Sequence, residues 1–444
     1  MKYIILGFLV IFFINGCSTK EFKVLDIDDS KVKELNEIPQ DVSYYLNNYK
    51  DNNKLKESQK TYISKYYKIW IKKPNIKVSQ AFWAFKVYNK KRNYYGVNLK
   101  LYDENFYKKN YYNANIKDYM TLNKKALTLH VTNLRAFPTD DVLFINPNKA
   151  GEGFPFDYLQ NSLISSNKPL YVSHISKDRK WAFVFSSFTS GWVKLKDIVF
   201  IDNKEAKVWM NAKQVFIHKE NQKVIKDSNY ILTYRLGMLL PYIGEDSKKY
   251  KVLAVLEGNN NQANFTQISI DKKYASLEPL IFNKKNIKII ISQLQKSKYG
   301  WGGMYKQRDC SSSMRDFFAP FGIWLPRNSS AQSKIGKVIK LSNLDNDEKK
   351  ELILKQGIPF ETLVYKKGHI ALYVGSYNNE PIIFQNVWGI KTKNDKKTGR
   401  IIIGRSIFST LELGKDLDNV DKESLFLQKL KSINIVTAVN SSSF

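Results

Sequence analysis

Short β-like runs separated by turns fill the middle of this chain, and this pattern limits the folds that the sequence can adopt. Between residues 126 and 202 the runs are 127–131, 170–172, 181–185 and 191–193, with turn-rich sequence such as NPNKAG at 146–151 between them. A second set comprises 207–209, 215–218, 238–242, 252–256 and 265–270. Short strands at this spacing are typical of small barrels. We therefore predict two small β-barrels, at 126–202 and 203–272.

The segment that follows, 273–444, combines helical and strand patterns. It opens with four apolar residues at helical spacing, Ile287, Ile290, Ile291 and Leu294. Asn283 is a candidate N-cap for this helix. A second helical pattern begins near Cys310, and strand patterns follow at 368–375 and 381–388. Helices followed by a strand meander predict an α+β fold.

The first 17 residues, MKYIILGFLVIFFINGC, indicate export. A lysine followed by a short apolar core is typical of a secretory signal peptide and is too short for a spanning helix. The end of this stretch resembles a bacterial lipobox, so we expect residues 1–16 to be removed and Cys17 to be acylated. The alternative is an ordinary signal peptide with an incidental cysteine.

These features predict where the mature protein lies. Ser18 follows the lipobox, whereas an aspartate there would resemble an inner-membrane retention signal. We therefore expect a lipid-anchored protein on the periplasmic face of the outer membrane of a Gram-negative bacterium. Residues 17–42 would form the lipidated cysteine and its tether, and the aromatic-rich residues 43–125 a mostly helical region.

Composition excludes several classes of protein. The chain has 444 residues, and its 43% hydrophobic content is enough for packed cores, which excludes wholesale disorder. Two cysteines exclude a disulfide scaffold and a multi-cysteine metal site. The net charge of +30, from 71 Lys+Arg and 41 Asp+Glu, is spread over every segment. It fits a composition bias or attraction to an anionic surface better than binding of nucleic acid, which we do not expect.

Cys310 needs a chemical explanation, because it is the one cysteine left if Cys17 serves as an anchor. It precedes a helical pattern, and a helix N-terminus favours the thiolate. His369 begins a strand pattern and can act as a base, and Gln385 or Asn386 on the next strand can orient it. The alternative is a buried structural cysteine and an unrelated edge-strand histidine.

Motifs around these residues resemble those of the NlpC family of bacterial cell-wall cysteine peptidases. In the last segment they are YGWGG at 299–303, DCS at 309–311, PFG at 320–322, LPRNS at 325–329, GHI at 368–370 and FQNVWG at 384–389. Upstream they are RAFPT at 135–139, GEGFPFD at 151–157 and GWV at 191–193, which resemble the first bacterial SH3-type domain of a multidomain branch. The resemblance covers most of residues 45–415 and implies a papain-like domain preceded by two SH3-type domains.

The resemblance implies hydrolysis of peptidoglycan stem peptides, usually between γ-D-glutamate and meso-diaminopimelate, through a thioester. It makes Cys310 the nucleophile, His369 the general base and Gln385 the third polar residue, where many relatives have histidine. A neutral amide oxygen can still accept the imidazole N–H. Strand parity leaves an alternative open. With a tight turn at 378–379, His369 shares its face with Asn386, whereas a longer loop restores Gln385, which we favour.

Five further residues are candidates for substrate binding. In relatives, the acid that matches Asp309 binds a free amine of the substrate, and we expect Ser311, Tyr299 and Trp301 to line the cleft. Asp157 is the candidate from the first SH3-type domain, which closes one end of the cleft in relatives. The simpler alternatives are helix capping for Asp309, packing for Trp301 and a turn or capping role for Asp157.

The sequence thus predicts a monomeric, lipid-anchored cysteine endopeptidase acting on muropeptides, with no cofactor and no metal. His130, His174 and His218 fall in strand-like segments, and we interpret them as structural. One alternative is a non-catalytic wall-binding protein with SH3-type modules and a degenerate peptidase domain, to which only Gln385 gives support. Another is a transferase or lipid-modifying enzyme on the same scaffold, which would need an open apolar groove.

Overall fold

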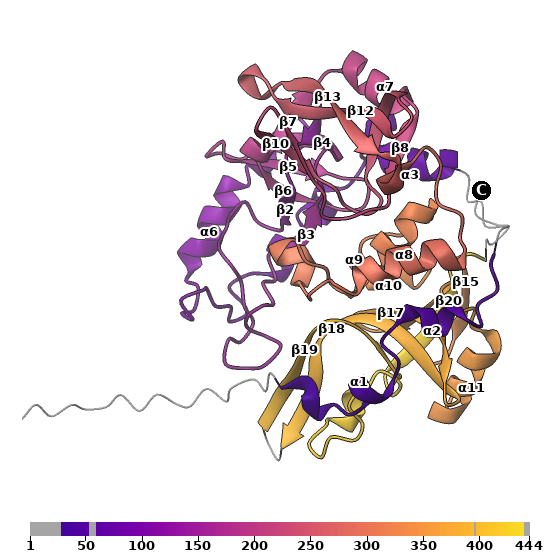
Figure 1. Cartoon of the computed structure of the whole chain (residues 1–444). Helices are drawn as coiled ribbons and strands as arrows, with labels where there is room; N and C mark the ends of the chain where they lie inside the picture. Colours follow the sequence, from indigo (N-terminus) through magenta and orange to yellow (C-terminus); the bar gives the residue numbers. More distant parts are fainter. Residues whose placement is uncertain (1–27, 53–58, 395–396, 439–444) are drawn as a thin grey trace, which may run out of the picture.

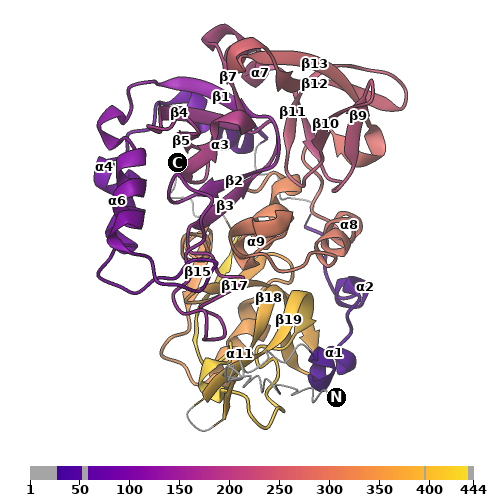
Figure 2. The same ribbon diagram turned by 90° about the vertical axis from the view of Figure 1, so that its left-hand side faces the viewer.

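The computed structural model describes residues 28–52, 59–394 and 397–438. It combines helices with antiparallel sheets, as the α+β prediction requires. Figures 1 and 2 show helices α8 (Lys284–Leu294) and α9 (Cys310–Phe318) lying between two sheets from the middle of the chain and a third sheet from its C-terminal part. Among the described residues, no helix is both long and apolar enough to cross a membrane.

The N-terminal region is helical and lies against other parts of the chain. Its helices are α1 (Glu34–Glu37), α2 (Val42–Leu46), α3 (Gln59–Ile71), α4 (Val78–Ala81), α5 (Trp83–Val87) and α6 (Glu104–Asn113). We expected residues up to 42 to form a tether, but the described part, 28–42, packs on the C-terminal sheet (Figure 2). Gln40 exchanges two hydrogen bonds with the backbone of Phe408, because its amide completes that edge strand.

The segment 126–202 forms most of a seven-stranded antiparallel sheet of order β3-β2-β6-β5-β4-β1-β7. The strands are β1 (Lys124–Thr128), β2 (Thr132–Arg135), β3 (Gln160–Ile164), β4 (Pro169–Ile175), β5 (Trp181–Phe185), β6 (Ser190–Lys194) and β7 (Ile198–Ile201). The sequence pattern found β1, β4, β5 and β6 and missed the other three. Helix α3 packs on β4, where the Trp70 indole donates to the carbonyl of Leu170 at 2.8 Å.

The next segment forms a five-stranded sheet of order β13-β12-β11-β8-β14 and a separate hairpin of β9 and β10. The elements are α7 (Asn203–Asn211), β8 (Gln214–Ile217), β9 (Lys223–Lys226), β10 (Asn229–Thr233), β11 (Leu239–Glu245), β12 (Lys249–Glu257), β13 (Ala263–Asp271) and β14 (Ala275–Ser276). The expected strand at 207–209 is wrong, because these residues belong to α7. Asp202 and Glu205 form a capping box that starts this helix.

The C-terminal part holds a six-stranded antiparallel sheet of order β15-β20-β16-β17-β18-β19. Its elements are α8, α9, α10 (Ser329–Gln332), β15 (Lys337–Lys340), α11 (Asn346–Gln356), β16 (Thr362–Lys366), β17 (His369–Tyr377), β18 (Glu380–Asn394), β19 (Lys397–Ser409) and β20 (Leu430–Ile435). The predicted helix is confirmed as α8, capped by Asn283 with its four apolar residues fully buried. α8 and α9 share one apolar cluster with the sheet, so the start of α9 is held against β17.

The connection between β17 and β18 is a tight turn. Tyr377 lies opposite Glu380, and only Asn378 and Asn379 connect them. Both asparagines have positive φ, 48° and 60°, as two-residue hairpin turns require. The longer loop that we considered is therefore absent from this described hairpin.

A β-bulge nevertheless places Gln385 beside His369. The register of β17 and β18 shifts by one residue between Tyr373 and Gly375. Because a one-residue shift moves side chains to the opposite face, the bulge reverses the parity that the tight turn would impose. Gln385, and not Asn386, consequently shares a face with His369.

Candidate active site

Cys310 is the first residue of α9, and the residue before it caps the helix. The Ser312 amide donates to Asp309 Oδ1 at 2.8 Å, and the Asp309 amide donates to Ser312 Oγ at 2.9 Å. This capping box explains locally why the helix begins here. The thiol side chain is nearly buried, with the residue 8% exposed. The amide of Ile370, at the start of β17, donates to it.

The Asp309 carboxylate is fully engaged inside the protein. Arg327 contacts its two oxygens at 2.6 and 3.2 Å, and the Ser311 hydroxyl donates to Oδ1 at 3.2 Å. Burial alone would raise the pKa of Asp309, but the Arg327 charge and the hydrogen bonds outweigh it and hold that pKa below its usual range. Asp309 is therefore a helix cap, the role that the sequence offered as the alternative to substrate binding, and it is also the partner of a buried guanidinium, which the sequence did not predict.

His369 and Gln385 form a direct hydrogen bond, 2.7 Å from Nε2 to Oε1. Gln385 Nε2 donates to Ser409 Oγ at 2.7 Å, and this hydroxyl donates in turn to the carbonyl of Thr410. Because the Ser409 proton is used in that way, its oxygen must accept from the amide nitrogen, and Oε1 must face the imidazole. Neutral His369 therefore carries its proton on Nε2 and leaves Nδ1 as the acceptor.

Asn386 takes no part in this chain of hydrogen bonds. Its side chain is fully buried, and Nδ2 donates to the carbonyl of Lys298 at 3.4 Å. The structure thus brings together His369 and Gln385, and leaves Asn386 on the other face of β18.

Burial sets the protonation states of the two central groups. It raises the pKa of the Cys310 thiol to about 12, and the charge of Asp309 acts in the same direction. It lowers the pKa of His369 to about 4, helped by the charge of Lys366 and opposed by the bond from Gln385. Both pKa shifts favour the neutral thiol and the neutral imidazole in the free site. Burial thus opposes the preference for the thiolate that we expected from the helix N-terminus.

An aromatic wall joins the first sheet to this site. Phe156, in the loop between β2 and β3, lies 5.2 Å from Trp301, 4.7 Å from Trp388 and 6.3 Å from Tyr299, measured between ring centroids. Sequence reasoning did not single out Phe156, although it lies in the GEGFPFD motif. A side chain from the loop between β2 and β3 therefore forms part of the lining of the cleft.

Asp157, the residue after Phe156, is hydrogen-bonded to one ring of this wall and is itself buried. It is 1% exposed, and its carboxylate pairs with Arg135 and accepts the amides of Leu143 and Leu159. Its backbone carbonyl accepts the Trp301 indole N–H at 2.9 Å. With both carboxylate oxygens occupied, Asp157 has the turn-stabilising role that we had set against substrate binding.

Tyr299, His369 and Gln385 line an open cleft of about 310 Å³. Two cations, Lys366 and Arg400, line the same cleft. Lys366 Nζ donates to the carbonyl of Ser424 at 3.0 Å, and Arg400 donates to the carbonyl of Gly399 at 3.0 Å. Neither cation forms an ion pair with a residue that the structure describes. Burial, and after it the charge of Arg400, lowers the pKa of Lys366 to about 8.

Sequence reasoning did not identify Ser409, Lys366 or Arg400. These residues lie on strands in which the alternation of polar and apolar residues does not distinguish a functional side chain from an ordinary surface one. Pairing of the strands in the sheet brings them to the cleft. Within the described residues, no group of three His, Cys, Asp or Glu side chains could hold a metal ion. His174 is buried and bonded through Nε2 to the carbonyl of Ala114 at 2.9 Å, as a structural histidine would be.

Three family models match the chain. They are the NlpC/P60 family over residues 296–397, an NLPC_P60 N-terminal stabilising domain over 6–119, and an SH3 domain of the SH3b1 type over 143–194. This chain therefore combines a peptidase-family domain with an SH3-type domain. The former is an NlpC/P60 domain, and that family is generally one of cysteine peptidases.

A solved structure agrees with this assignment. The chain is similar to a NlpC/P60 endopeptidase from Photobacterium damselae subsp. piscicida, with 25% identity, a TM-score of 0.79, and coverage of 90% of this chain and 98% of that one. A NlpC/P60 family protein from Bacillus cereus ATCC 10987 is matched at 14% identity and a TM-score of 0.43, over 70% of this chain and 98% of the other. No curated protein matches.

The raised pKa of Cys310 predicts slow thiol alkylation at neutral pH. In the chain from residue 18 onward, where Cys310 is the one cysteine, the iodoacetamide rate should rise about tenfold per pH unit up to pH 10, because only the thiolate reacts. The same chain unfolded in denaturant is the control, and its rate should level off near the ordinary thiol pKa of about 8.5. A folded-state rate that is already constant below pH 8 would indicate a resting ion pair instead.

Proposed function

We propose that this protein is a cysteine endopeptidase that cuts peptidoglycan stem peptides at the γ-D-glutamyl–meso-diaminopimelate bond. The carrying observation is the chain of hydrogen bonds through Ser409, Gln385 and His369, which leaves an unprotonated imidazole nitrogen at the strand start where the Ile370 amide contacts Cys310. The NlpC/P60 domain supports a cell-wall substrate. The intact hydrogen bond to Gln385 favours catalysis over the wall-binding alternative, whose only support was this residue.

The reaction follows from these protonation states. As the Cys310 sulfur attacks the γ-glutamyl carbonyl carbon, its proton passes to His369 Nδ1. A thiolate–imidazolium pair therefore need not form before the substrate binds. Collapse of the tetrahedral intermediate breaks the C–N bond, and His369 returns the proton to the departing amine of diaminopimelate. Water, deprotonated by His369, then hydrolyses the thioester, which releases the γ-carboxylate and restores the thiol.

The oxyanion of the intermediate needs a preorganised donor. Cys310 is the first residue of α9, so its amide has no acceptor within the helix and adds to the positive end of the helix dipole. We assign this amide to the developing oxyanion.

The shape and the positive charge of the cleft favour a short peptide with carboxylate groups. Phe156 from the SH3-type domain narrows it beside Tyr299 and Trp301, which supports recognition of a small stem peptide rather than a large folded substrate. Lys366 and Arg400 offer two unpaired cations within reach of the carboxylates that flank the scissile bond of such a peptide. A free amine of the substrate would meet Asp309 and Ser311 only by competing with Arg327.

We further propose the cell-envelope setting that the N-terminal sequence predicts. Residues 1–27 lie outside the described part of the chain, so cleavage before Cys17 and its acylation rest on the lipobox-like sequence. The five-stranded sheet after α7 is proposed as a second SH3-type domain, and the protein as a monomer.

Loss of the thiol tests the proposed chemistry directly. Cys310→Ala should abolish cleavage of purified muropeptides, followed by mass spectrometry, while the melting curve stays close to that of the parent. Ser376→Ala, at an exposed position on the same strand as His369, is the control and should keep full activity. Turnover of Cys310→Ala within about tenfold of the parent, or about 1.4 kcal/mol of barrier, would exclude Cys310 as the nucleophile.

The third polar position gives a sharper test. Gln385→Ala should lower kcat roughly 10- to 100-fold with KM nearly unchanged, because the imidazole loses its orienting acceptor. Gln385→His should retain or raise activity. Asn386→Ala should leave kcat close to the parent value. The assignment is wrong if Asn386→Ala is crippling and Gln385→Ala is silent.

The Lys366 cation predicts a pH-dependent KM. A lysine is charged below its pKa, so binding of a substrate carboxylate should weaken as the pH rises through about 8, and KM should increase. Lys366→Arg should keep KM flat up to pH 9, since a guanidinium stays charged. An equal rise of KM in both proteins would assign the effect to another group.

Acylation of Cys17 is tested by fractionation. Cys17→Ser should move the protein from the membrane fraction to the soluble envelope fraction, because acyl chains supply the attachment. An unchanged membrane fraction would point to an uncleaved anchor or to electrostatic binding.

A further inference from the structure

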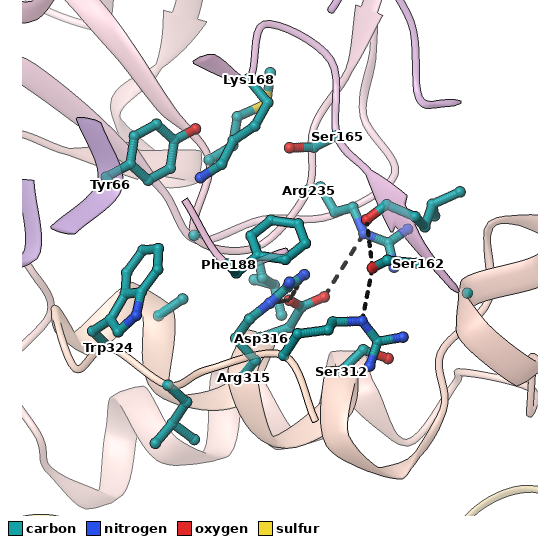
Figure 3. Close-up of a pocket in the computed structure, with 18 of the residues that line it drawn as sticks. Tyr66, Ser162, Ser165, Lys168, Phe188, Arg235, Ser312, Arg315, Asp316 and Trp324 are labelled. Carbon is teal, nitrogen blue, oxygen red and sulfur yellow. Dashed lines mark hydrogen bonds and ion pairs between the residues drawn. The ribbon is translucent and has the colours of Figure 1, made fainter. Parts of the chain in front are cut away.

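A second cavity lies where three parts of the chain meet, away from the cleft (Figure 3). Its walls come from Tyr66 on α3, from Ser165 and Lys168 beside β4 of the SH3-type domain, and from Arg315 and Asp316 on α9. Its volume is about 50 Å³. A space of this size holds a few waters or one small anion.

Lys168 is the most unusual side chain of this cavity. It is 5% exposed, and its ammonium nitrogen lies 3.0 Å from the ring centroid of Tyr66 and 5.8 Å from those of Phe188 and Trp324. It forms no ion pair or side-chain hydrogen bond with any residue in the described part of the chain. A cation–π interaction with an aromatic ring stabilises a desolvated cation by only about 2 kcal/mol. This is less than the free energy that burial of the charge costs. Burial consequently holds the pKa of Lys168 well below its usual range.

Arg315 also lines this cavity, and its guanidinium is only partly hydrogen-bonded. Its guanidinium carbon stacks 4.2 Å from the ring centroid of Phe188, and its contacts with Asp316 are long, at 3.3 and 3.4 Å. The buried Nη1 atom has no hydrogen-bond partner among the described atoms. Figure 3 shows Lys168 and Arg315 on opposite sides of the cavity, and the charge of Arg315 disfavours protonation of Lys168.

The carboxylates near the cavity already form ion pairs with arginines. Asp316 is the one carboxylate among the described lining residues, and it also contacts Arg308 at 2.8 Å and Arg235 at 3.7 Å. The Asp309 carboxylate is paired with Arg327. Water could fill the hydrogen-bonding needs of the cavity, but it carries no charge, so it could not stabilise a protonated Lys168 beside Arg315 as an anion would.

We propose that this cavity binds a small oxyanion, of the size of acetate or phosphate, between the Lys168 ammonium and Arg315 Nη1. The anion would connect the SH3-type domain to the helix that begins at Cys310, and so stabilise the contact between these domains. Two sources share this chemistry, a free carboxylate and inorganic phosphate. The site is distinct from the cleft, so it does not depend on the proposed peptidase activity.

Calorimetric titration of the chain from residue 18 onward tests the proposal, with acetate and phosphate titrated separately at constant ionic strength. One site per chain should saturate with at least one of them, and the melting midpoint should rise by about 2 °C or more at saturation. Saturation by acetate alone identifies a carboxylate ligand, and saturation by phosphate alone identifies a phosphate. No saturable binding of either anion would overturn the proposal.

Two variants separate this site from general surface attraction. Lys168→Met should lose the anion response and, without anion, melt at or above the parent midpoint, since a buried amine without a side-chain hydrogen bond is removed. Lys177→Met, at an exposed position after β4, should keep the response. If Lys168→Met does not fold, Arg315→Gln takes its place, and its affinity should fall at least tenfold. An equal anion response in the parent and all variants would mean surface binding only and would overturn the proposal.

Discussion

Two buried arginines on either side of Cys310 hold the start of α9, and the rest of the site depends on that position. Arg308 pairs with Glu220 from the segment after β8 and with Asp316 on α9 itself. Arg327 pairs with the capping residue Asp309 and donates to Ser162 Oγ on β3 at 2.7 Å. Removing one partner of such a buried pair typically costs about 3–5 kcal/mol, because the other charge is left without compensation. The same interactions therefore fix the helix start and connect it to both middle sheets.

This arrangement also fixes the orientation of the polar groups around Cys310. Burial disfavours both the thiolate and the imidazolium, and so opposes a preformed ion pair. What the site supplies is orientation, since the chain from Ser409 through Gln385 to His369 selects one imidazole tautomer. A neutral amide can orient the imidazole, because the requirement is a fixed acceptor for the imidazole N–H and not a charge.

Positive charge has two different roles in the molecule. In the cleft, Lys366 and Arg400 are partly buried and form no ion pair with a described residue, and we propose that they bind substrate carboxylates. At the domain junction, Lys168 has no ion-pair partner among the described residues, and Arg315 pairs only with Asp316 at 3.3 Å and leaves its buried Nη1 without a partner. Burial there disfavours the charged form of Lys168. The diffuse +30 of the chain gave no indication of either pair, because composition does not distinguish enclosed cations from solvated ones.

The sequence by itself determined the elements that depend on neighbouring residues. The helix start at Cys310, the apolar face of α8 and the strand start at His369 follow from caps and periodicity, which act over three or four residues. It failed where local signals were weak, as at 207–209, where a capping box made a helix of an expected strand. Only the tertiary structure decided which polar residue meets His369, because a single bulge at Gly375 reverses the parity set by a tight turn. It alone also decided the pKa values and the partners of Asp157, Asp309 and Lys168, since burial and long-range pairing arise from packing between distant segments.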